Sequence, residues 1–110
     1  MTTEQLKHFL AVKAICALGN TLQRIFNQLH ADEVIYMPLV KPLLEDLSKR
    51  MTEVENTPAI DELHSKMENF INGISENTTN GQVAQILSDV HLIIDKIYWQ
   101  VSEEIGIPHP

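Results

Sequence analysis

The sequence predicts an all-α protein, folded as an antiparallel, up-down four-helix bundle. Three observations favour this class. Apolar residues recur three and four positions apart over long segments. Only 4 glycines and 5 prolines interrupt the 110 residues. The two later connections are a few residues long, and such short connections make consecutive helices antiparallel. We expect helices at about residues 3–29, 41–55, 58–76 and 81–105, within one domain that spans residues 1–110.

The first helix, over residues 3–29, should begin after Thr2, because Thr2 followed by Gln5 three residues later has the form of a capping box. Gly19 is followed by Asn20, and this pair weakens the helix enough to favour a bend there. The inner face is expected to be a stripe of apolar residues, with Phe26 and Ala11 beside it, that comprises Ile15, Leu18, Leu22, Ile25 and Leu29.

The segment from residue 30 to 41 is expected to be a connection. Pro38 and Pro42 lie four residues apart, and both cannot occupy the first turn of one helix. We therefore place Pro42 near the start of the second helix, over residues 41–55, and read residues 34–38 as an extended or single-turn approach that packs on the bundle. The inner face of this helix should consist of Val40, Leu43, Leu44, Leu47, Met51 and Val54.

The third and fourth helices have clear start signals. Thr57 before Pro58 is a favourable N-cap followed by proline at the first helical position, and Thr79 with Gln82 forms a second capping box. Gly106 stands where a left-handed residue ends a helix. The expected inner faces are Ile60, Leu63, Met67, Phe70 and Ile74 in residues 58–76, and Val83, Leu87, Val90, Ile94, Ile97, Val101 and Ile105 in residues 81–105.

Composition narrows the function classes. The net charge is −7, from 15 acidic and 8 basic residues, so the surface should repel phosphate backbones and we expect no direct binding to nucleic acid. The single cysteine, Cys16, excludes an intramolecular disulfide framework and suits a reducing compartment. The N-terminus lacks the pattern of a signal peptide, and no apolar run reaches the roughly 20 residues that cross a bilayer. We therefore expect a cytoplasmic protein that does not bind membranes.

A search for chemistry yields no catalytic, metal-binding or cofactor motif. The strongest alternative is a small ligand- or metal-binding enzyme built on His64, His91, Asp95 and Tyr98, because His91 and Asp95 lie one turn apart and His64 occupies the edge of another helix. Edge histidines that bond to neighbouring side chains explain the same residues. We expect no cofactor and no catalytic residue, and read Cys16 as a small buried apolar residue.

Some apolar residues do not fit the expected core. Leu92 and Trp99 fall nearly opposite the apolar stripe of residues 83–105, and Lys96 borders them. A similar departure occurs in the first helix, where three residues project away from the expected inner face: Leu6, Phe9 and Leu10. Tryptophan is enriched at binding hot spots. These six residues are our candidates for a partner or oligomer interface.

Two arrangements of the chain would instead bury the candidate interface. Residues 34–37 could fold over Leu92 and Trp99, and a bend near Gly19 could turn the start of the first helix inward. The interpretation that we carry forward is a non-enzymatic protein–protein interaction module that binds a partner or itself, such as an adaptor, an inhibitor or an assembly factor. Small acidic helical proteins of this kind are common among phage and plasmid accessory factors, which is an association of size and charge only.

Overall fold

A computed structural model describes residues 1–54 and 57–106 of the chain. These residues form four α-helices and no strand. The helices are α1 (Thr3–Gln28), α2 (Met37–Met51), α3 (Pro58–Asn72) and α4 (Asn80–Ile105). The all-α class and the number of helices confirm the prediction from the sequence.

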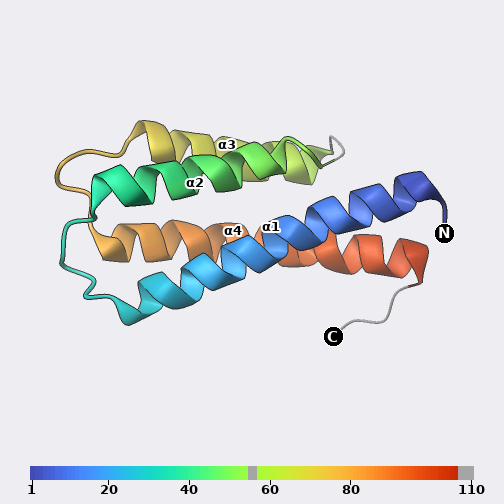
Figure 1. Ribbon diagram of the computed structural model, residues 1–110, viewed down its shortest axis with the longest axis horizontal. Coiled ribbons are helices and arrows are strands. Elements are labelled where there is room, and N and C mark those ends of the chain that lie inside the picture. Colours follow the sequence, from blue (N-terminus) through green and yellow to red (C-terminus); the bar gives the residue numbers. More distant parts are fainter. Residues whose placement is uncertain (55–56, 107–110) are drawn as a thin grey trace.

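Successive helices run in opposite directions, as Figure 1 shows. Two contacts establish this for α1 and α4: the ring of Phe9 lies 5.8 Å from the ring of Tyr98, whereas the amide of Gly81 donates to the carbonyl of Ala31 just beyond the end of α1. The start of α1 therefore lies beside the end of α4, and the reverse holds at the other end. The arrangement is an up-down bundle in which α1 packs most extensively against α4.

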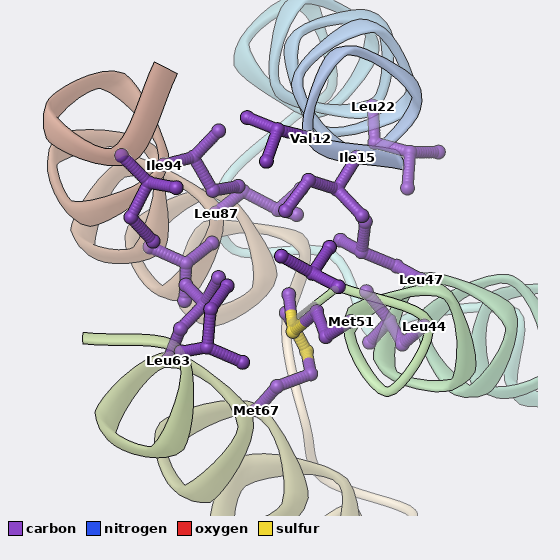
Figure 2. Close-up of a cluster of buried hydrophobic side chains, with 14 of the residues drawn as sticks. Val12, Ile15, Leu22, Leu44, Leu47, Met51, Leu63, Met67, Leu87 and Ile94 are labelled. Carbon is purple, nitrogen blue, oxygen red and sulfur yellow. The ribbon is translucent and has the colours of Figure 1, made fainter. Parts of the chain in front are cut away.

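The core lies between the two helix pairs and receives side chains from all four helices (Figure 2). Ile15, Leu44, Leu63 and Leu87 are among the fully buried residues, one from each helix. Transfer of each such side chain from water contributes roughly 1.5–3 kcal/mol to folding. Met51 of α2 and Met67 of α3 are fully buried in this cluster (Figure 2). Flexible thioether side chains fill irregular spaces in a core well.

The buried face of α1 differs from the expected stripe. Leu18 is only half-buried, and Ile25 and Leu29 are exposed. The buried face is rotated toward α4, against which Phe9 and Gly19 lie. The Gly19-Asn20 pair does not interrupt α1, which is helical from end to end. The residues of α1 that are buried instead are Phe9, Val12, Ile15, Gly19, Leu22 and Phe26.

Helix α2 begins earlier than predicted and contains both prolines. It starts at Met37, so Pro38 lies in the first turn, where no N–H is needed, and Pro42 lies inside the helix. Pro42 lacks the N–H that would bond to the carbonyl of Pro38, and both residues are exposed, so water can reach that carbonyl. The expected inner face is otherwise correct, with Leu43 half-buried.

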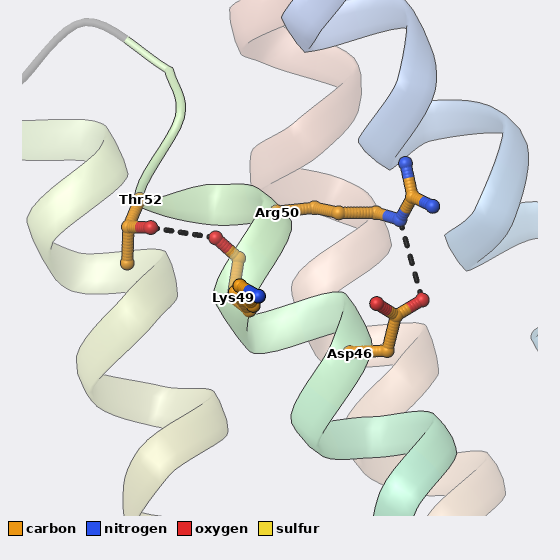
Figure 3. A network of polar contacts seen from close by, with 4 residues as sticks. All are labelled: Asp46, Lys49, Arg50 and Thr52. Atoms are coloured by element: carbon orange, nitrogen blue, oxygen red, sulfur yellow. Dashed lines mark hydrogen bonds and ion pairs between the residues drawn. The ribbon is translucent and has the colours of Figure 1, made fainter.

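The end of α2 is fixed by local polar contacts (Figure 3). Thr52 Oγ1 donates to the carbonyl of Lys49 at 2.6 Å, and Arg50 Nε donates to Asp46 Oδ2 at 3.3 Å. Lys49 and Arg50 also place positive charge in the last turn, where it interacts favourably with the negative end of the helix dipole. The helix ends at Met51 rather than near residue 55, a position that lies outside the described residues.

The predicted start signals of α1, α3 and α4 are confirmed. Thr2 and Thr79 form complete capping boxes with Gln5 and Gln82, and Thr57 accepts a hydrogen bond from the amide of Ile60. Helix α4 ends, as predicted, at a left-handed Gly106, with φ of 73°. Helix α3 is shorter than predicted. It ends at Asn72, and Ile71 is buried where Phe70 and Ile74 were expected.

The connection between α1 and α2 is held by backbone pairing with the start of α4. Val34 and Thr79 form an isolated antiparallel bridge, Ile35 donates its amide to the carbonyl of Thr78, and Asn80 donates its amide to the carbonyl of Glu33. Ile35 is buried. The expectation that this segment packs on the bundle is correct, but it does have a pairing partner, which the sequence did not indicate.

The helices are unequal in length, and this shapes the molecule. α1 and α4 have 26 residues each, whereas α2 and α3 have 15. At 1.5 Å per residue the long helices span about 39 Å and the short ones about 22 Å. Figure 1 shows that the first turns of α1 and the last turns of α4 extend beyond the α2–α3 pair. The α1–α4 pair thus forms the long side of the bundle.

Candidate functional site

The side of the α1–α4 pair that faces away from α2 and α3 carries large apolar side chains in solvent. Their exposed fractions are 41% for Leu6, 53% for Leu10, 66% for Leu92 and 46% for Trp99. On each helix these positions lie opposite the buried face. We call this surface the outer face and define it by Leu6, Leu10, Lys13, Ala17 and Arg24 of α1 and by Asp89, Leu92, Lys96, Trp99 and Glu103 of α4, all of which are exposed.

Phe9 does not belong to the outer face, so its assignment to the candidate interface is wrong. It is 7% exposed, and its ring meets that of Tyr98 at an interplanar angle of 39°. Phe9 is on the side of α1 that faces α4, between the buried face and the exposed positions Leu6 and Leu10. Tilted aromatic pairs of this kind add about 0.5–1.5 kcal/mol beyond their burial. Phe9 therefore joins the ends of α1 and α4.

Neither of the two arrangements that would bury the exposed residues occurs in the fold. The segment of residues 34–37 pairs with the start of α4 at Thr79, and it leaves Leu92 and Trp99 exposed. Leu6 and Leu10 remain 41% and 53% exposed, so no bend of α1 turns them inward. The outer face is thus a property of the folded chain and is not covered by any described residue of it.

Charged groups surround the apolar residues of the outer face. Lys13 Nζ lies 5.6 Å from the centre of the Tyr98 ring, which draws this cation toward α4. Lys96 is exposed on α4, as are Asp89 and Glu103. An apolar strip with polar borders is typical of protein-binding surfaces.

A second group of exposed apolar residues was not anticipated from the sequence. Its members lie at the end of α1, in the connection that follows, and in the first turn of α2: Ile25, Leu29, Val34, Tyr36 and Leu39. Two of them belong to the inner stripe expected for the first helix. α1 contains two overlapping apolar stripes, and periodicity alone does not show which of them is buried. The sequence therefore could not reveal that Ile25 and Leu29 are exposed. We call these residues the loop-end group.

The residues of the alternative enzyme hypothesis are not brought together. His64 Nε2 lies 3.6 Å from Glu68 Oε1 one turn away on α3, and Ser48 of α2 donates a hydrogen bond to the same carboxylate oxygen. Tyr98 is buried against Phe9. Across residues 1–54 and 57–106, no group of three His, Cys, Asp or Glu side chains is placed to hold a metal ion. The metal site suggested for His64, His91 and Asp95 is therefore not assembled.

Cys16 occupies a half-buried position on α1. Burial raises the pKa of its thiol above the usual value, and the negative charge of Asp95 on α4 raises it further. Lys13 and a hydrogen bond from Asn20 Nδ2, at 3.7 Å, act in the opposite direction. Because the thiolate is the nucleophile, a raised pKa makes this cysteine less reactive, as the apolar surroundings in the sequence suggested.

A hollow of about 600 Å³ opens beside the projecting ends of α1 and α4. Half of its lining residues, Glu4, Lys7, Glu53 and Glu104, are charged, and its apolar residues, Val101 and Ile105, come from the last turns of α4. Lys7 and Glu4 within it form an exposed ion pair at 3.7 Å. The residues that line it are Glu4, Gln5, Lys7, His8, Glu53, Val101, Glu104 and Ile105. Ligand pockets are usually enclosed and predominantly apolar, unlike this hollow.

One helix in the described ranges, α1, is long and apolar enough to cross a membrane by length and composition, with a mean hydropathy of 1.2 over 18 residues. Core helices of soluble proteins and signal sequences have the same composition. A third of that window is buried in the bundle. This result modifies the expectation that no apolar run in the sequence approaches the length of a membrane span.

Comparison with protein families, curated proteins and solved structures finds no match for this chain. The fold and the geometry of the candidate site therefore carry the functional argument. They define a four-helix, up-down bundle whose two long helices carry an apolar outer face.

Proposed function

We propose that this chain is a non-enzymatic protein–protein interaction module that docks through the outer face of α1 and α4. The observation that carries the proposal is the exposure of Leu6, Leu10, Leu92 and Trp99 on one side of a well-packed bundle. Leaving such side chains in water forgoes roughly 1.5–3 kcal/mol each, which binding recovers. The core is complete without them, so folding does not explain their positions.

The outer face has the anatomy of a docking surface. Trp99 and Leu92 lie seven residues apart on α4, and therefore two turns apart along the same side of the helix. Lys96 stands between them in the chain, and Asp89 and Glu103 lie beyond either end. An aromatic anchor with a polar rim is the usual arrangement of residues that dominate binding energy.

The classes of activity that fit this proposal are those of an adaptor, an inhibitor or an assembly factor, whose partner is a protein or a second copy of the chain. Direct binding to nucleic acid is disfavoured by the net charge of −7. A reducing, cytoplasmic location suits the unpaired Cys16. Small, acidic accessory proteins of phages and plasmids have these features in common, and we extend that association to this chain as part of the proposal.

The test compares two exposed leucines in the same kind of assay. Leu92→Ser lies on the outer face, and Leu39→Ser lies in the loop-end group, so both remove one solvent-exposed leucine from a helix. Each variant and the parent chain are used as bait in the host of origin, with quantitative mass spectrometry of the captured proteins and light scattering of the purified chain. Thermal unfolding of each variant controls for stability.

We expect Leu92→Ser to lower capture of specific partners, or self-association, about tenfold or more, with an unchanged unfolding midpoint when both chains are compared at a concentration where they are monomeric. Leu39→Ser should leave both unchanged. Equal capture and equal self-association by Leu92→Ser and the parent chain would overturn the proposal. So would a result in which Leu39→Ser alone loses binding, because the loop-end group would then be the docking surface.

A further inference from the structure

The two long helices are in a fixed register along the outer face. Three contacts set it, at the start, the middle and the end of α1. They join Phe9 to Tyr98, Gly19 to Ile94 and Ala31 to Gly81. From Gly19 to Ala31 the chain advances 12 residues along α1 while it goes back 13 along α4, from Ile94 to Gly81, so the two helices keep nearly the same level there, whereas the large rings of Phe9 and Tyr98 meet across a wider offset.

This register places two pairs of outer-face residues side by side. Leu10 follows Phe9 and Trp99 follows Tyr98, so Leu10 and Trp99 lie within a turn of the same level. Arg24 is five residues after Gly19, and Asp89 is five residues before Ile94, so these two also lie at one level. All four outer-face residues are exposed. Each pair therefore combines one residue of α1 with a residue of α4 of matching chemistry, apolar in the first pair and oppositely charged in the second.

The charges of the two helices are opposite. α1 contains Lys7, Lys13 and Arg24 against Glu4, a net charge of +2, although the whole chain carries −7. α4 contains four acidic residues, Asp89, Asp95, Glu103 and Glu104, against Lys96, a net charge of −3. Among the outer-face residues themselves, Lys13 and Arg24 make α1 positive, and Asp89 and Glu103 against Lys96 make α4 negative.

We propose that the occupant of the outer face is a second copy of this chain, related by a two-fold axis parallel to the helices. This inference rests on the proposed function, and it names the partner. Rotation about such an axis keeps every residue at its level and lays α1 of each copy on α4 of the other. Leu10 then faces the partner's Trp99, and Arg24 faces the partner's Asp89, each twice in the dimer.

The charge pattern selects this axis over its alternative. A two-fold axis across the helices would lay α1 on α1 and α4 on α4, and would oppose helices of the same net charge. Like charges across an interface cost several kcal/mol, whereas complementary ones fix the orientation. Only the axis along the helices makes the outer face complementary to itself.

The size of the face is adequate for a stable dimer. Two helices side by side, each about 39 Å long and about 10 Å across, present about 780 Å². A standard protein–protein interface takes about 800 Å² from each partner. Leu6, Leu10 and Trp99 would be buried at the end of the interface where α1 begins and α4 ends, and Leu92 near its middle.

The first test is the mass of the purified full-length chain in reducing buffer, by sedimentation velocity over a series of concentrations. We expect a species of twice the 12.5 kDa mass of one chain. Arg24→Glu and Asp89→Arg each bring like charges together twice in the dimer, and each alone should weaken the dimer about tenfold or more. Glu62→Arg, an exposed charge reversal on α3, is the matched control and should leave the dimer unchanged.

The decisive test mixes the two single variants, Arg24→Glu and Asp89→Arg. In a mixed dimer, the two introduced side chains would face each other with opposite charges, and the unaltered Asp89 of one copy would face the unaltered Arg24 of the other. Association should therefore return to the parent level. A monomer at all concentrations overturns the inference, as does a dimer that either reversal leaves unaltered or that mixing does not rescue. A monomer that still loses a captured partner on Leu92→Ser overturns the dimer alone and leaves the proposed function standing.

Discussion

Gly19 of α1 lies against Ile94 of α4, so that a Cβ atom at Gly19 would come 3.4 Å from Ile94 Cδ1. This close approach is in the middle of both helices, and Gly19 is buried there. Gly19 belongs to the buried face of α1, which is rotated away from the exposed Ile25 and Leu29. This distance is that of an ordinary van der Waals contact, and the atom that the added Cβ would contact, Ile94 Cδ1, is the end of a flexible side chain.

We expect Gly19→Ala to stabilise the protein. Alanine is favoured over glycine in a helix interior by about 1 kcal/mol, and its methyl group fits against Ile94 with little movement. Thermal or urea unfolding monitored by circular dichroism measures the change. Gly19→Leu is the matched variant: its larger side chain has no room beside Ile94 and should lower stability by about 1–3 kcal/mol. A destabilised Gly19→Ala would show that Ile94 cannot yield to even one added methyl group.

A second prediction concerns Pro42, which lies inside α2. Proline there removes the hydrogen bond to the carbonyl of Pro38 and costs about 3 kcal/mol in a helix interior, partly offset by up to about 1 kcal/mol because it restricts the unfolded chain. Pro42→Ala should therefore raise the free energy of unfolding by about 1–2 kcal/mol. Pro38→Ala, in the first turn, should change it by a few tenths of a kcal/mol at most. Equal effects at the two positions would contradict this account.

A third prediction concerns Thr79, which caps α4 through two hydrogen bonds with Gln82. Its side chain accepts from the amide of Gln82 at 3.3 Å, and its own amide donates to Gln82 Oε1 at 2.9 Å. Thr79→Ala should cost about 1 kcal/mol in chemical denaturation. Thr79→Ser keeps the hydroxyl and should cost much less. If serine is as damaging as alanine, the cap is not the cause, and the bridge to Val34 is the next candidate.

Helix α4 shows how much of the fold is determined by residues that are close together in the sequence. Its start at Thr79, its stripe from Val83 and its stop at Gly106 are signals carried by neighbouring residues, and all three agree with the structure. The helices of the bundle and their alternating directions follow from such signals and from short connections. The end of α2 was misplaced, because the contact between Thr52 and the carbonyl of Lys49 has no counterpart in apolar periodicity.

The candidate site depends on tertiary packing and was only partly predictable. Leu6, Leu10, Leu92, Lys96 and Trp99 are exposed as the sequence indicated. Phe9 is buried, because the ring of Tyr98 lies beside it, far away in the chain. Ile25 and Leu29 of the loop-end group were missed for a related reason: the apolar residues of the first helix form two stripes, and the position of α4 decides which of them is buried.

The last prediction concerns the thiol of Cys16. Burial and the negative charge of Asp95 raise its pKa, so alkylation by iodoacetamide near neutral pH should be slower than for an exposed cysteine in a short peptide. Asp95→Asn removes a negative charge that disfavours the thiolate, so the pKa should fall and the rate at a given pH should rise. The exposed Asp95 acts through solvent, so this difference should shrink in high salt. The measurement is the alkylation rate as a function of pH, with Asp89→Asn as control, because Asp89 does not contribute to the shift at Cys16. An unchanged pH midpoint in Asp95→Asn would mean that burial alone sets the reactivity of Cys16.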